Sequence, residues 1–268
     1  QRSTTQYVDS NGAPSNSLLL AEVTVANGAA SIGNSVISDR RIVSNLTFNN
    51  GWNRFSVTPA YASSTTFTLT GDWTNVLSKG TKIWCKQSGS SKYFYVTGTS
   101  YSTGTTTVTV TGGSDYTVAN AAIYDAHYSQ ASSPAGFPDW FNYTPTYTNL
   151  TVGNGTHSSK FRISNKTVSF RLGFTLGNSS SVGGFITATL PVTSAALKVE
   201  EPIGIGFIQD SGTAWFGAVA RYATTTTVDI APQNAASTYL QVSASSSTVP
   251  MTWTTNDGLF INGQYEIA

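Results

Sequence analysis

Hydrophobic and polar residues alternate with a period of two along most of this chain. In "TTFTLTGDW" Phe67 and Leu69 alternate with threonines, and in "KTVSFRLGFTLG" Val168, Phe170 and Leu172 fall on one face. A period of two is typical of strands that bury one face, because successive side chains of a strand point to opposite sides of its sheet. Gly, Ser and Asn-Gly turns separate the alternating segments, so the sequence predicts an all-β protein.

One segment departs from this alternation. "DYTVANAAIYDAHY", residues 115–128, is the only stretch in which a helix is plausible. It is short, and its Val, Thr and Asn residues have low helix propensity. We therefore expect at most one short helix, near Tyr116 to Tyr128.

Stretches rich in Gly, Pro and Ser divide the predicted strands into successive parts. Residues 1–50 are predicted to be an N-terminal connecting segment with strand pairing, and residues 51–130 a small β domain. Residues 131–147 are a junction rich in proline and aromatic residues. Residues 148–268 contain about eight predicted strands, the number typical of a two-sheet sandwich. The predicted fold is therefore a small β domain followed by a jelly-roll-like β-sandwich head.

The stretch "SPAGFPDWFNYTPTYTNLT", residues 133–151, begins inside the junction and holds three prolines and five aromatic residues. Its prolines keep the backbone extended and remove donors from a strand ladder. We expect Phe137, Trp140 and Phe141 to pack between the two β domains. The alternative is an exposed aromatic platform that binds a ligand.

Composition limits the function classes. The net charge is +1 and the basic residues are scattered, so we expect no nucleic-acid partner. No apolar run approaches the roughly 20 residues that span a bilayer, so we expect no membrane insertion. Cys85 is the only cysteine, which excludes a disulfide within the chain. Gln1 stands where an initiator Met would be, and we expect a processed chain or a fragment that lacks an upstream part.

Few residues suggest catalysis or metal binding. His127 and His157 have no partner at a metal-ligand spacing, and a zinc site needs three or four ligands. The adjacent acids Glu200 and Glu201 would point to opposite faces of a strand, which does not suit the shared site of a glycoside hydrolase. Two carboxylates distant in the sequence could still converge. We expect no metal, no cofactor and no enzymatic activity.

Most of the tryptophans lie in or beside predicted strands, where burial in the core is expected. These are Trp73, Trp84, Trp140, Trp215 and Trp253. Trp215 directly follows the loop "QDSGTA", so it could instead lie at the rim of the sandwich.

Several segments, taken in order, resemble tail and baseplate proteins of tailed bacteriophages. "PSNSLLLAEVTVANGAASIGNSVISDRR" is similar to a segment that recurs in those proteins. "TTFTLTGDWTNVLSKGTKIWCKQSGSSKYFYVTGTSYSTGTTTVTVTGGSDYTVANAAI" resembles the small β domain that often follows it. "GFPDWFNYTPTYTNLTVG" and "PMTWTTNDGLFINGQYEIA" resemble the junction and the closing strands of their distal domain. Each pattern is loose, but their order is more specific than any one of them.

The resemblance implies a receptor-binding protein of the phage tail, with a distal head that contacts the host-cell surface during adsorption. It implies a homotrimer in the virion, other tail or baseplate proteins as partners, and a location outside the cell at the host surface. A three-fold tip would present equivalent weak sites together, so that avidity strengthens the binding of a host glycan. The resemblance carries no binding residues.

The loop before Trp215 is the predicted binding site. Two convincing strands flank "QDSGTAW", so its backbone would be held while its tip remains free to vary. Asp210 and Ser211 offer hydrogen-bonding groups to sugar hydroxyls, and Trp215 offers a flat apolar face. A purely structural tail, baseplate or head-fibre component is the alternative. A polysaccharide depolymerase is a further one, and it would need a carboxylate pair in a groove.

Overall fold

The computed structural model describes residues 21–23, 37–39, 51–236 and 238–268. The chain divides into two compact units, residues 1–49 and residues 50–268. In the first unit, β1 (Ala21–Val23) pairs antiparallel with β2 (Ile37–Asp39). The described residues contain strands and turns but no helix, so the all-β class is confirmed. It follows that no helix in this part of the chain could cross a membrane.

The first part of the larger unit is a seven-stranded antiparallel sheet with the order β3-β9-β6-β7-β8-β5-β4. Its strands are β3 (Asn53–Arg54), β4 (Ala60–Ser63), β5 (Thr66–Thr70), β6 (Lys82–Gln87), β7 (Ser90–Ser102), β8 (Thr105–Thr111) and β9 (Tyr124–Ser129). Phe67 and Leu69 alternate with threonines in β5 and are both buried, as the sequence pattern predicts. They join a core that includes Phe94 of β7 and Val108 of β8.

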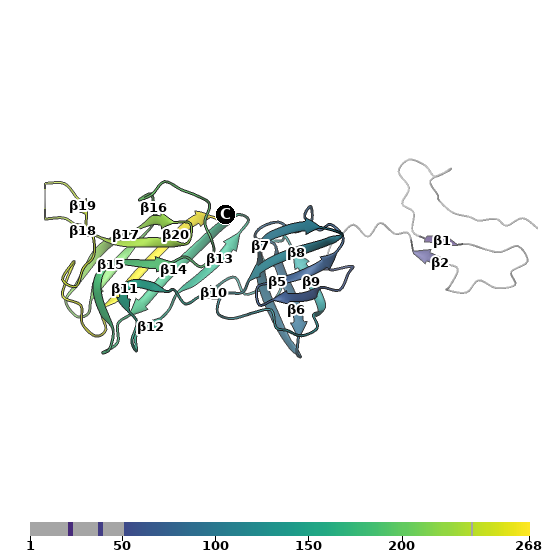
Figure 1. The fold of residues 1–268 in the computed structure, drawn as a ribbon, viewed down its shortest axis with the longest axis horizontal. Helices are drawn as coiled ribbons and strands as arrows, with labels where there is room; N and C mark the ends of the chain where they lie inside the picture. Colours follow the sequence, from purple (N-terminus) through teal and green to yellow (C-terminus); the bar gives the residue numbers. More distant parts are fainter. Residues whose placement is uncertain (1–20, 24–36, 40–50, 237) are drawn as a thin grey trace, which may run out of the picture. The chain divides into compact units, whose positions relative to one another are not determined.

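The second part of this unit is an eleven-stranded sheet whose main path has the order β10-β13-β14-β20-β16-β17-β18-β15-β11. Its strands are β10 (Phe141–Asn142), β11 (Tyr147–Thr151), β12 (Thr156–His157), β13 (Lys160–Ser164), β14 (Thr167–Thr175), β15 (Ser181–Thr189), β16 (Pro202–Asp210), β17 (Ala214–Thr224), β18 (Thr227–Asn234), β19 (Gln241–Val242) and β20 (Gly258–Glu266). In Figure 1, β20 is the yellow strand that lies between β14 and β16.

This sheet curls into half a barrel, which is consistent with the predicted β-sandwich. Tyr147 of β11, at one end of the strand order, lies with its ring centre 5.4 Å from that of Phe174 in β14. The curl encloses one core, to which β14 contributes Val168, Phe170 and Leu172 from a single face. The period of two in this segment therefore predicted both the strand and its buried face.

The aromatic junction is part of this core. Phe137 and Phe141 are buried, and their ring centres lie 5.0 and 5.3 Å from that of Tyr95 in β7. The backbone N–H of Asn142 also donates a 2.8 Å hydrogen bond to the carboxylate of Asp115. Phe137 and Phe141 thus pack strands of the two sheets together, as predicted.

The same prediction is wrong for Trp140. This residue directly precedes Phe141, whose side chain points into the core. The ring of Trp140 is only partly buried, and it lies beside the guanidinium groups of Arg162 and Arg171. Neighbouring residues of an extended chain point to opposite sides, so Phe141 and Trp140 cannot both enter one core.

The short helix that the sequence allowed near Tyr116 to Tyr128 does not form, and β9 occupies the end of that segment. The residues before β9 are fixed by a side chain from another strand and not by the hydrogen bonds of a helix. The side-chain amide of Gln87 in β6 donates hydrogen bonds to the backbone carbonyls of Ala119 and Ala121. The strand itself pairs with both β6 and β3. These contacts with other parts of the chain outweigh the weak helix propensity of the segment.

Candidate functional site

A pocket opens in the eleven-stranded sheet where two neighbouring strands separate. The ladder between β17 and β18 ends at the pair Ala218–Pro232. The next two residues of β18, Gln233 and Asn234, pair with β19 instead. Pro232 lies at this end of the ladder, and its carbonyl accepts a 2.8 Å hydrogen bond from the N–H of Ser243. The separated strands and the segment that follows β18 enclose a pocket of about 510 Å³.

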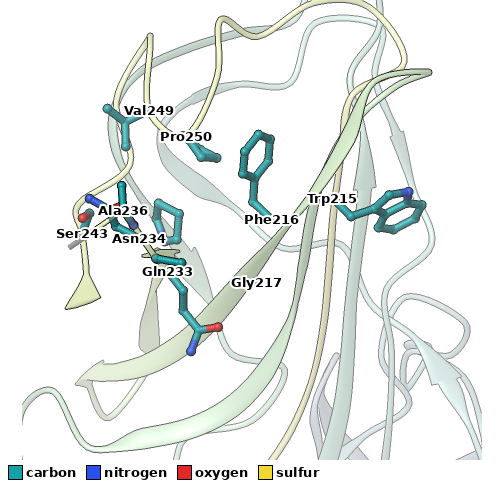
Figure 2. A pocket seen from close by; sticks show the side chains of 11 residues that line it. Trp215, Phe216, Gly217, Gln233, Asn234, Ala236, Ser243, Val249 and Pro250 are labelled. Atoms are coloured by element: carbon teal, nitrogen blue, oxygen red, sulfur yellow. The ribbon is translucent and has the colours of Figure 1, made fainter. Parts of the chain in front are cut away.

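The pocket has an apolar wall and a polar wall. Figure 2 shows the ring of Phe216 pointing toward Pro250, with Val249 on the same side as Pro250. Gln233, Asn234 and Ser243 supply amide and hydroxyl groups. The complete lining is Trp215, Phe216, Gly217, Pro232, Gln233, Asn234, Ala235, Ala236, Ser243, Val249 and Pro250. Its volume lies within the range of about 300–1,000 Å³ that is typical of small-molecule sites.

The polar groups of the pocket are uncharged and mostly unengaged. No hydrogen bond joins the side-chain amide of Gln233 or the hydroxyl of Ser243 to any residue that the structure describes. The side-chain oxygen of Asn234 accepts a 2.9 Å hydrogen bond from the N–H of Ala236, which leaves its NH₂ group. No lining residue is acidic or basic. The pocket therefore suits an uncharged ligand with several hydrogen-bonding groups.

Gly217 allows the Gln233 side chain to lie against β17. A Cβ at this position would lie 2.3 Å from Oε1 of Gln233, which is closer than real contacts allow. Any larger residue would push the amide of Gln233 away from the strand. This glycine therefore helps to fix the polar wall.

Trp215 lies at the rim of the pocket. A tryptophan beside a strand is usually buried in the core, but this one is not. Its side chain is 59% exposed, and in Figure 2 it projects to the opposite side of β17 from Phe216. Its ring centre lies 6.1 Å from those of Phe207 in β16 and Phe260 in β20. These two rings lie beside the indole, which remains mostly exposed to solvent.

Asp210 and Ser211 lie in the hairpin between β16 and β17, outside the pocket lining. The carbonyl of Asp210 accepts a 3.0 Å hydrogen bond from the N–H of Thr213, which closes a tight turn. The N–H of Ser211 donates a 2.9 Å hydrogen bond to the buried carboxylate of Asp257. Of the three residues predicted to bind a ligand, only Trp215 is therefore at the pocket.

The sequence did not reveal the other pocket residues. Phe216, Gln233, Ser243 and Pro250 come from separate strands and from the segment before β20. No motif links them. The available signal was Pro232 near the end of a predicted strand, which marks a place where strand pairing stops.

The histidines and the paired acids have other surroundings. His127 stacks on Trp84 with ring centres 4.7 Å apart, and His157 stacks on Tyr147. Glu200 forms a 3.2 Å ion pair with Arg221. Within the described residues, no group of three His, Cys, Asp or Glu side chains could hold a metal ion.

Comparisons of this chain with protein-family models, with curated proteins and with solved structures find no match. The fold and the pocket are therefore the basis for a functional proposal.

Proposed function

We propose that this chain is a receptor-binding protein of a bacteriophage tail that attaches to a saccharide on the host-cell surface. The observation that carries the proposal is the exposed indole of Trp215, a lining residue of an uncharged pocket whose ring lies on the opposite side of β17 from that of Phe216. The order of segments that resembles phage tail proteins supports the biological setting. Other tail or baseplate proteins and two further copies of the chain complete the proposed assembly.

The chemistry of the pocket matches that of a neutral sugar. A pyranose ring has a C–H face that packs on an aromatic plane, and hydroxyls that need donors and acceptors at its edge. Trp215 supplies the plane, while Gln233 and Ser243 supply hydrogen-bonding groups that no described residue uses. An open site of this kind binds weakly by itself, and three copies on one tip would add avidity.

The test is binding of labelled protein to a glycan array and to a panel of bacterial cells. We expect Trp215→Ala to reduce binding at least about tenfold, the effect of losing about 1.4 kcal/mol. Tyr101→Ala is the matched control, because Tyr101 is an exposed aromatic residue of the seven-stranded sheet. Wild-type binding by the Trp215 variant would place the site elsewhere. Release of sugar from a polysaccharide by the purified protein would favour the depolymerase.

A structural role is the second candidate, and the outer face of the sheet favours it. Ile205 and Phe207 are exposed on the same side of β16 as Trp215 is on β17. Large exposed apolar side chains in one patch often mark an interface between subunits. Solution mass measurements at micromolar concentration test this: the proposed trimer should lose subunits in Ile205→Ser. A structural component would assemble in the same way but bind neither glycans nor cells.

A further inference from the structure

A group of positive charges surrounds Trp140 on the outer face of β13 and β14. The centre of the Arg171 guanidinium lies 4.4 Å from the centre of the indole ring, and that of Arg162 lies 5.0 Å away. Lys160 is the cross-strand partner of Arg171. All three basic residues are exposed, because the alternate residues Phe161 and Phe170 fill the core. We call these three residues with Trp140 the basic cluster.

The basic cluster is not neutralised within the described chain. None of the three basic side chains forms an ion pair or a hydrogen bond through its charged group with any described residue. Asp139 directly precedes Trp140, yet its carboxylate is not paired with them either. Like charges on directly opposite strand positions destabilise a sheet. The arrangement therefore leaves an electrostatic cost that an anion would remove.

Stacking on Trp140 prepares the arginines to bind such an anion. A guanidinium that lies over an aromatic ring uses its face, and its N–H groups at the edge remain free to donate. The ring also limits the conformations of both side chains, so less entropy is lost when a ligand arrives. Ser169 and Asn262 are the cross-strand partners of Arg162 and Arg171, and they add polar groups to the same face.

We propose that the basic cluster binds the phosphate groups of an anionic polymer. A carboxylate offers two oxygens in one plane and is satisfied by a single guanidinium fork. A phosphate group spreads its oxygens in different directions, so it can accept from two guanidinium groups and an ammonium at once. Two arginines over one ring, with Lys160 opposite Arg171 on the next strand, match the second geometry better. This site is separate from the pocket at Trp215, and it does not depend on the saccharide proposal.

The experiment measures the affinity of the whole chain for inorganic polyphosphate by calorimetry at several salt concentrations. The test variant carries Arg162→Gln and Arg171→Gln together, and both side chains are exposed, so folding should be retained. Arg54→Gln is the matched control, because Arg54 is an exposed arginine of the seven-stranded sheet. A second variant with Arg162→Lys and Arg171→Lys keeps both positive charges but replaces the planar guanidinium groups with ammonium groups. Hyaluronate serves as the carboxylate polymer.

We expect wild type and Arg54→Gln to bind polyphosphate more tightly at low salt. The double Gln variant should bind polyphosphate at least about tenfold more weakly than wild type. The slope of log affinity against log salt concentration should become less negative by about two, one for each arginine removed. The double Lys variant should keep the salt dependence and bind several-fold more weakly. Absence of polyphosphate binding by wild type overturns the proposal, and so does equal binding by the double Gln variant. Tighter binding of hyaluronate than polyphosphate would overturn the assignment to phosphate.

Discussion

Truncation of Phe141 offers the sharpest test of how the aromatic junction works. Its side chain is fully buried, and its ring contacts those of Tyr95, Phe137 and Phe161 at centre distances of 5.3, 5.6 and 6.1 Å. Because these partners come from both sheets, Phe141→Ala should open a cavity that neither sheet can close alone. Large-to-small changes of buried phenylalanine cost about 3–5 kcal/mol. For a unit of this size, about 2–4 °C per kcal/mol gives a fall in melting temperature of about 6–20 °C.

Trp140→Ala is the matched control, since the two residues are adjacent in the chain. It removes two cation–π contacts on a partly exposed ring, for which we expect a loss of about 1–2 kcal/mol. Thermal and urea unfolding of both variants, followed by circular dichroism, measure the difference. If Trp140→Ala were as destabilising as Phe141→Ala, or if Phe141→Ala cost less than about 1 kcal/mol, the assignment of core and surface at this junction would be refuted.

Three further predictions follow from local surroundings. Gly80 and Gly89 have similar positive φ angles of +84° and +81°, but their surroundings differ. A Cβ atom on Gly80 would lie 2.0 Å from the carbonyl oxygen of Asn165, whereas a Cβ atom on Gly89 would have no heavy atom within 4 Å. Gly80→Ala should therefore lower the urea midpoint much more than Gly89→Ala, which costs about 1 kcal/mol of backbone strain; equal shifts would contradict this. Burial raises the pKa of the Cys85 thiol to about 12, so iodoacetamide at pH 8 should label Cys85 only after the protein unfolds. Rapid labelling of the folded protein would contradict the burial of Cys85. Burial lowers the pKa of His157, so as the pH falls the imidazole is protonated in the unfolded chain before it is protonated in the folded protein, and the free energy of unfolding should fall as the pH drops below about 6.5. His157→Phe should reduce this loss of stability in melting curves recorded at several pH values. An unchanged pH profile of the melting temperature would contradict the prediction.

The strands were predictable because their pattern is local. Each half-buried strand needs an apolar residue at every second position, and β5 and β14 show this directly. The order of strands in the sheet was not predictable in this way. β20 inserts between β14 and β16, and nothing in its own residues indicates which strands it joins. The strand at the end of the segment where a short helix was plausible was not predictable for the same reason, because its partners β3 and β6 lie far from it in the sequence.

The candidate site was predictable only in part. A tryptophan next to a turn can be recognised in the sequence, and Trp215 does lie at the rim of a pocket. The pocket itself depends on the point at which the ladder between β17 and β18 ends, which is a property of strand register. Asp210 and Ser211 are adjacent to β17 in sequence, but the tight turn that contains them is tied to Asp257 instead of the pocket. Of the three residues predicted from sequence proximity, one therefore lines this pocket and two lie outside its lining.

Strand register also explains why the two proposed binding regions share one sheet. Arg171 pairs with Asn262 of β20, and Asn262 pairs with Ile205 of β16. Ile205 in turn pairs with Val219 of β17, the strand that carries Trp215. Four neighbouring strands about 4.8 Å apart thus bring the cationic face of β14 within roughly 15 Å of the apolar face of β17. Two strands, β20 and β16, lie between β14 and β17, and the outer face changes from polar to apolar between Asn262 of β20 and Ile205 of β16. Charge and apolar surface that are dispersed in a chain with only 10% charged residues are thereby gathered on one face. The register therefore places the basic cluster and the exposed indole of Trp215 on the same face of one sheet.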